Sequence, residues 1–154
     1  NIPHEIREKM GTKVHGCDLC QEACPRNAGK LKAKLPPDPF LVNLAVDFSL
    51  TKMLEMPAGF LETRVLPIMY NYIKDQKYFQ RNAAIALGNL GDPEAVPALT
   101  RALANPEGLV RGYAAWGLGR IGGSQARSAL EARLPGESDA FAREEISAAL
   151  AATA

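Results

Sequence analysis

The sequence has few aromatic residues, histidines and cysteines, almost no net charge and no long apolar run. Aromatic residues make up only 6% of its 154 residues, the formal net charge is +1, and there are two histidines and three cysteines. Near-neutral charge argues against a strongly basic nucleic-acid arm or an acidic tail, although it allows local patches. No apolar run approaches the roughly 20 residues of a membrane helix, and no secretory signal pattern opens the chain. We therefore expect a cytoplasmic protein.

An odd number of cysteines fits a disulfide framework poorly. All three cluster in one run, Cys17-x2-Cys20-x3-Cys24-Pro25. The first residue is Asn1 and not methionine. We therefore expect the chain to be a piece of a longer protein.

Composition divides the chain into three zones. Residues 1–38 hold every cysteine and histidine and end in a proline-rich stretch, whereas residues 39–75 carry larger apolar groups. Residues 76–154 are rich in alanine and lack cysteine. We predict a metal-binding segment, a helical connector and a repeat domain, in that order.

The alanine-rich zone repeats itself. The segment 82–91 recurs 31 residues later as 113–122, and a weaker third copy covers residues 143–150. A constant offset near thirty indicates stacked supersecondary units that bury their apolar faces against one another. Apolar positions spaced by three and four predict helices, two in each unit. The expected fold class is therefore all-α, an α-α superhelix.

Local signals place the helix ends. Gly91 is a plausible helix stop, Asp92 a cap and Pro93 the first residue of the next helix. Gly88 and Gly119 occupy equivalent positions in two copies, at a cost of about 1 kcal/mol each in helix propensity. Their recurrence predicts close contact between helices at these two positions.

The repeats resemble HEAT-like repeats of the short, alanine-rich bacterial type. The resemblance covers residues 82–99 and 110–122. Such repeats are generally scaffolds for binding, so on their own they name no reaction.

The cysteine spacing puts three thiols on one side of a helical turn or a tight loop, where they are expected to converge. Soft thiolate ligands suit iron–sulfur clusters and zinc, and the closing C-x3-C-P matches the end of a bacterial ferredoxin run. One alternative is a zinc site completed by His15 or His4, and another is three reduced thiols without metal. We interpret both histidines as surface or packing residues.

The residues around the cysteines narrow the family. The relevant segments are Ile2–Arg7, Met10-Gly11, His15–Asn27 and, at the start of the repeats, Gln80–Asn89. Their order resembles that of the epoxyqueuosine reductases, cobalamin- and iron–sulfur-dependent enzymes that perform the last step of queuosine formation in tRNA.

The resemblance implies a ferredoxin-like [4Fe-4S] segment over residues 1–38. Cys17 and Cys20 would ligate one cluster together with upstream cysteines, and Cys24 would ligate the other. The cobalamin site and the catalytic acid would lie in an upstream domain of the same chain. No catalytic residue is expected here, and the electron donor is not identified.

Basic residues give candidate contacts to a tRNA stem-loop. Lys30, Lys32 and Lys34 alternate after the motif, and Arg81 and Arg111 lie in the repeats. Such groups could neutralise phosphates, although a solvated face is the alternative. Trp116 and Tyr113 could stack on a base, yet a tryptophan inside a helix beside alanines is more often a core residue. A second hypothesis for the whole chain is a non-enzymatic HEAT-like scaffold with a structural zinc knuckle.

Overall fold

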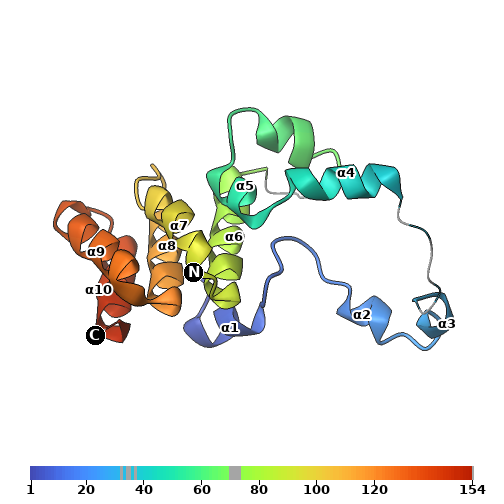
Figure 1. Ribbon diagram of the computed structural model, residues 1–154, viewed down its shortest axis with the longest axis horizontal. Helices are drawn as coiled ribbons and strands as arrows, with labels where there is room; N and C mark the ends of the chain where they lie inside the picture. The colour runs from blue at the N-terminus through green and yellow to red at the C-terminus, as the bar shows by residue number, and fades with distance from the viewer. Residues whose placement is uncertain (32, 34–35, 37, 70–73, 154) are drawn as a thin grey trace.

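A computed structural model describes residues 1–31, 33, 36, 38–69 and 74–153. Its regular elements within these residues are all helical, and the C-terminal half forms a stacked array (Figure 1). The array consists of α6 (Gln76–Leu90), the 3-10 turn η2 (Pro93–Ala95), α7 (Val96–Ala102), α8 (Gly108–Ile121), α9 (Gly123–Arg133), the 3-10 turn η3 (Leu134–Gly136) and α10 (Ala140–Ala152). We call α6, α8 and α10 the first helices, because each is the first helix of its repeat unit. They stand side by side, and α7 and α9 form a second layer. The all-α repeat fold is confirmed.

The predicted boundary between the first two helices of the array is also confirmed. Helix α6 ends at Gly91, whose φ of 70° lies in the left-handed region, where glycine carries no Cβ penalty. The Asp92 carboxylate accepts a hydrogen bond from the backbone N–H of Glu94, and Pro93 opens the next turn. At the other end of α6, the Asp75 side chain caps the backbone N–H of Lys77.

Glycine permits the close approach between the first helices. A Cβ added at Gly88 would lie 2.8 Å from the Cα of Gly117 and 2.9 Å from Cζ3 of Trp116, both in α8. A Cβ at Gly119 would lie 2.8 Å from the Cβ of Ala149 in α10. The recurring glycines therefore mark helix contacts, as their equivalent positions predicted.

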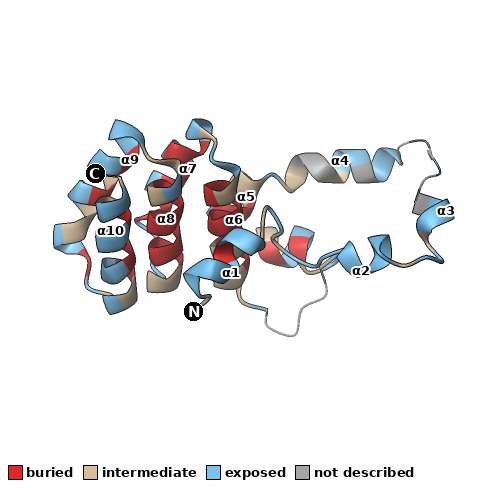
Figure 2. Ribbon diagram, turned by 90° about the horizontal axis from the view of Figure 1, so that it is seen from below, coloured by how far each residue is buried: buried red, intermediate tan, exposed pale blue. Residues whose placement is uncertain are grey.

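The core of the array is continuous from the connector to the last helix. Buried side chains include Ile85, Leu99, Tyr113, Leu130 and Ile146. Buried residues are concentrated in the helices of the array (Figure 2). Trp116 is buried as well, so the interpretation of Trp116 as a core residue is confirmed.

The connector is helical and packs on the start of the array. It contains α4 (Pro39–Asp47), α5 (Leu50–Glu55) and a π-helical turn, η1 (Leu61–Val65). Met53 and Leu54 of α5 and Val65 of η1 join the buried core, and the Gln80 side chain of α6 donates to the carbonyl of Leu54 at 2.9 Å.

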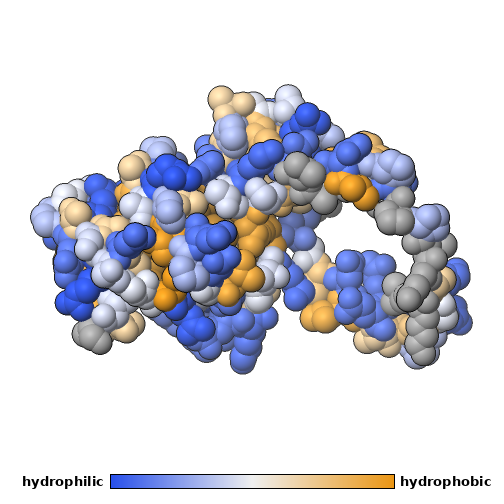
Figure 3. Space-filling view, in the orientation of Figure 1, coloured by the Kyte–Doolittle hydropathy of each residue, from blue (hydrophilic) through white to orange (hydrophobic). Residues whose placement is uncertain are grey.

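The N-terminal segment has two parts. Residues 1–16, which we call the arm, include α1 (His4–Lys9) and lie against the array, whereas α2 (Leu19–Glu22) and α3 (Ala28–Leu31) project away from it (Figures 1 and 2). Apolar surface lies on α2 and on α4, on either side of the opening between them (Figure 3). Two large apolar side chains, Leu19 and Phe40, are 58% and 67% exposed. Among the described residues, no helix has the length and apolar character needed to cross a bilayer.

Candidate metal centre and the arm that carries it

The three cysteines lie on and around α2. Cys20 is within the helix, Cys17 precedes it, and Cys24 follows it in a turn. Cys17 and Cys20 are exposed, Cys24 is partly buried, and all three thiols are free. The turn after α2 is held by Asn27, whose side chain donates to the carbonyl of Gln21 at 3.1 Å.

The expected convergence of the three thiols is not seen. Within the described residues, no three side chains of histidine, cysteine, aspartate or glutamate are grouped to hold a metal ion. The physical reason is local: α2 is only four residues long, so Cys24 lies beyond the helix that carries Cys20. Metal ligation by the cysteines stays a prediction, and the chain by itself supplies no complete metal centre in its described part.

Each histidine contacts a residue of the repeat array. His4 Nε2 is 3.3 Å from Glu145 Oε1 in α10. The His15 ring lies 5.7 Å, centroid to centroid, from the ring of Phe79 in α6. Both contacts agree with the interpretation of these histidines as surface and packing residues.

A hollow of about 510 Å³ adjoins Cys17. Its apolar wall comes from Phe48, Leu50 and Met69 of the connector, and Asp18 and Glu22 contribute carboxylates on the side of α2. An exposed thiol beside an apolar wall is chemically suited to hold a soft metal centre partly shielded from water.

The arm meets the array around a buried arginine that sequence reasoning did not single out. Arg7 is 2% exposed and donates from both terminal nitrogens to the Glu145 carboxylate, at 2.8 and 2.6 Å. Its guanidinium carbon lies 4.4 Å from the centroid of the Tyr113 ring. No sequence signal pairs Arg7 with a residue 138 positions away.

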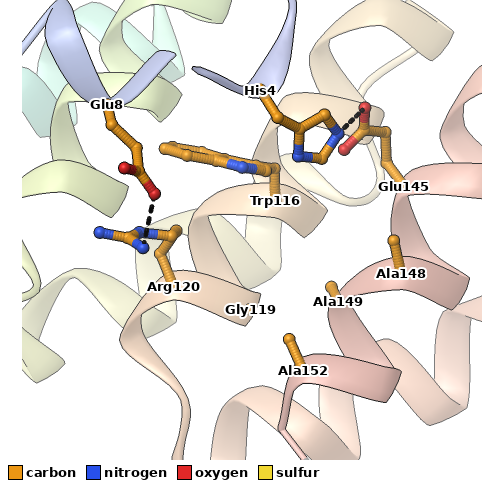
Figure 4. A pocket seen from close by; sticks show the side chains of 9 residues that line it. All are labelled: His4, Glu8, Trp116, Gly119, Arg120, Glu145, Ala148, Ala149 and Ala152. Atoms are coloured by element: carbon orange, nitrogen blue, oxygen red, sulfur yellow. Dashed lines mark hydrogen bonds and ion pairs between the residues drawn. The ribbon is translucent and has the colours of Figure 1, made fainter. Parts of the chain in front are cut away.

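A small cleft of about 260 Å³ opens beside this contact, between α1, α8 and α10 (Figure 4). Trp116 forms one wall, and Ala148, Ala149 and Ala152 line the side formed by α10. Polar pairs flank Trp116 on two sides: the ion pair of Glu8 with Arg120 at 2.9 Å, and the contact of His4 with Glu145.

The predicted RNA-contacting residues have different surroundings. Lys30 is exposed on α3, whereas Lys32 and Lys34 lie outside the described residues. Arg81 is half-buried, its Nε donates to Asn82 Oδ1 at 3.0 Å, and burial lowers the pKa of its guanidinium. Of these groups the structure describes only Lys30 and Arg81, which lie on different helices, α3 and α6.

Arg111 is placed differently from the sequence expectation. It is buried, and its Nε and Nη2 each lie 2.7 Å from an oxygen of Glu137. Its Nη1 donates to the carbonyls of Asn105 and Pro106 at 2.7 and 2.9 Å. All of these contacts are within the chain, so the Arg111 guanidinium is not available to bind an RNA phosphate.

Comparison with known families agrees with the repeat architecture. HEAT repeats match residues 66–151, more than half of the chain. The chain therefore belongs to the HEAT-repeat family.

The predicted resemblance to epoxyqueuosine reductases is confirmed over nearly the whole chain. The enzyme of Bacillus subtilis is 34% identical over 94% of this chain and 37% of its own length. The enzyme of Listeria monocytogenes is 32% identical over 96% of this chain and 38% of its own length. The chain thus spans little more than a third of these curated relatives.

Solved structures give the same result. A crystal structure of an epoxyqueuosine reductase with a tRNA-Tyr epoxyqueuosine-modified stem loop has a TM-score of 0.78 and 33% identity, and the match covers 98% of this chain and 40% of that one. The structure of the Bacillus subtilis enzyme has a TM-score of 0.77 and 33% identity, over 97% of this chain and 40% of its own. The likeness therefore includes the arm and the connector as well as the repeats.

Proposed function

We propose that this chain is the C-terminal part of a cytoplasmic iron–sulfur oxidoreductase similar to epoxyqueuosine reductase. The observation that carries the proposal is the likeness over nearly the whole chain, which includes the three-cysteine segment together with the repeats. Because the chain spans little more than a third of its relatives, the catalytic acid and the cobalamin site are assigned to an upstream domain.

In this proposal, Cys17 and Cys20 ligate one [4Fe-4S] cluster and Cys24 ligates another. A cluster of this type takes four thiolates, so three cysteines complete neither, and further cysteines must come from upstream. Free thiols in this segment, two of them exposed, suit a shared centre of this kind. When bound, such clusters relay single electrons, and the chain's own residues hold the iron and present the array to the substrate.

The repeats are proposed to help position a tRNA stem-loop. A related enzyme has been crystallised with such a stem loop. In this chain, exposed Lys30, its neighbours Lys32 and Lys34, and the half-buried Arg81 remain the candidate phosphate contacts. A cation near a phosphate contributes a salt-dependent term to affinity and carries no sequence information.

Metal analysis tests the cluster assignment. The intact gene product, purified without oxygen, should hold about eight irons with matching sulfide if two clusters form. Cys20→Ser should lower the iron content, whereas Glu94→Gln, at an exposed position of η2 away from the cysteines, should not. Stoichiometric zinc without sulfide would overturn the redox function and favour the scaffold with a zinc knuckle. A translation start near residue 1 would do the same.

Salt dependence tests the RNA contact. Replacing Lys30, Lys32 and Lys34 together with alanine should weaken binding of a tRNA stem-loop and reduce its salt slope by roughly one for each lost contact. Arg127→Ala is a suitable control because Arg127 lies on α9 and pairs with Glu131 at 2.9 Å. An affinity equal to that of the control would retire these lysines as contacts.

A further inference from the structure

The arm is attached to all three first helices of the array. Ile2, Met10 and Val14 pack against the core. The backbone N–H of Ile2 donates to the Tyr113 hydroxyl of α8 at 2.5 Å, and Arg7 pairs with Glu145 of α10. The start of the arm is therefore fixed by groups on α8 and α10.

Two asparagines of α6 fix the rest of the arm. Asn89 Nδ2 donates both to the carbonyl of Arg7 at 2.8 Å and to the carbonyl of Gly11 at 2.9 Å. Asn82 Nδ2 donates to the carbonyl of Val14 at 2.7 Å. A side-chain amide nitrogen has two hydrogens, and Asn89 donates both of them to carbonyls of the arm.

These asparagines lie seven residues apart, or two turns along one face of α6. Their bonds therefore set the register of the arm along the helix. On the arm they contact backbone carbonyls, so these three bonds do not depend on the identity of the arm's side chains. A carboxylate in place of either amide would face a carbonyl oxygen without a donor.

The attachment ends immediately before the first thiol. Val14 accepts the last asparagine bond, the His15 ring lies near Phe79 of α6, and Gly16 has a φ of 70°. Cys17 follows directly, and α2 projects from the array (Figure 1). The place at which the thiols leave the array is thus determined within three residues of Cys17.

We propose that Asn82 and Asn89 are positioning residues for the thiols. They hold the arm to α6, so that Cys17 and Cys20 meet the metal centre at one defined place and orientation. The inference rests on the proposed function, because the group that the thiols would hold is the cluster of that proposal. It adds that the repeat array, and not only the cysteine segment, determines the ligand geometry.

The test uses the double variant Asn82→Asp/Asn89→Asp in the intact protein. Aspartate keeps the oxygen that accepts from Arg81 Nε but removes the amide donors to the arm. Gln125→Glu is the matched control, since it makes the same amide-to-acid change at an exposed position of α9. Four quantities are measured: hydrogen exchange of residues 6–13, whose backbone N–H groups are bonded within the arm, thermal unfolding of the array, the iron content, and the midpoint potential of the clusters.

The double variant should raise exchange over residues 6–13 on the order of tenfold, because the backbone N–H bonds within the arm open more often when its carbonyls are no longer held to α6. Cluster affinity should fall on the order of tenfold, the usual effect of losing groups that orient metal ligands, and the midpoint potential should move. The control should change none of these quantities. A fall in iron content that exceeds any fall in the thermal stability of the array would separate positioning from general unfolding.

Two results overturn the inference. Unchanged exchange in the double variant would show that the asparagines do not hold the arm. Raised exchange with iron content and potential equal to those of the control would show that the array does not position the thiols. A wild-type protein without iron would instead overturn the proposed function itself, and the exchange measurement would still report on the arm.

Discussion

Glu137 is a buried charged residue of the array. Replacing its carboxylate by an uncharged group tests how much this charge contributes to the stability of the last repeat. Glu137 follows η3 and is 1% exposed. Its two oxygens accept from Arg111 at 2.7 Å each, from Arg133 at 2.9 Å, and from the backbone N–H of Asp139 at 2.8 Å. The Glu137 carbonyl also accepts from the Arg143 guanidinium.

These donors lower the pKa of Glu137 from 4.5 to about 2, chiefly through the Arg111 hydrogen bond, while burial opposes the change. At 1.36 kcal/mol per pH unit, that difference corresponds to about 3 kcal/mol of stability. Because the folded-state pKa is the lower one, this contribution is fully present above about pH 4.5. It is lost as the pH falls through about 2, where the folded state also binds the proton.

Glu137→Gln should therefore reduce the free energy of unfolding by about 3 kcal/mol at pH 7, since it leaves the buried Arg111 without its anion. The difference from wild type should shrink as the pH falls below 4.5 and approach zero near pH 2. Urea unfolding monitored by circular dichroism at a series of pH values measures both quantities.

Glu131→Gln provides the control, because Glu131 forms an exposed i,i+4 pair with Arg127. Such pairs contribute only about 0.3–0.5 kcal/mol. A loss below about 1 kcal/mol for Glu137→Gln at pH 7, or a loss that does not change with pH, would refute the assignment of a buried charge network.

Two further substitutions test packing and surface charge. Gly119→Ala should cost up to about 2 kcal/mol in urea unfolding, because overpacking against Ala149 (about 1–3 kcal/mol) opposes the gain of about 1 kcal/mol in helix propensity. Gly29→Ala, with nothing within 4 Å of the new Cβ, should not destabilise, because only the propensity gain applies there. Equal effects of the two substitutions would contradict close helix contact. Arg101→Ala should change stability by less than about 1 kcal/mol at low or high salt, since its ion pair with Glu55 is exposed; a larger, salt-sensitive loss would show that the pair is energetically coupled to the core.

The repeat architecture could be predicted because its signals are local and occur more than once. Gly91, Asp92 and Pro93 each act through their own backbone position, and their roles do not depend on distant partners. Gly88 and Gly119 pointed to helix contacts because the same residue recurs at the equivalent position of two repeats. Periodicity and capping determine such features before tertiary packing is known.

Contacts between distant residues could not be predicted in the same way. In the sequence Arg111 cannot be told apart from an exposed basic residue. Its structural role depends on its burial and on its bond to Glu137, 26 positions later. The expected convergence of three thiols failed for a related reason. Their spacing gives relative positions along an ideal helix, whereas the actual helix ends at Glu22, before the last cysteine.

The arm has a consequence for how the array unfolds. In a repeat stack each unit normally contacts only its neighbours, so its terminal units can fray one at a time. Here one short segment bonds to Asn89, Tyr113 and Glu145, one residue in each of the first helices. The first and third units are therefore coupled through this segment, and the stack should unfold as one cooperative block. The segment that leads to the cysteines therefore also stabilises the last helix, α10, against unfolding on its own.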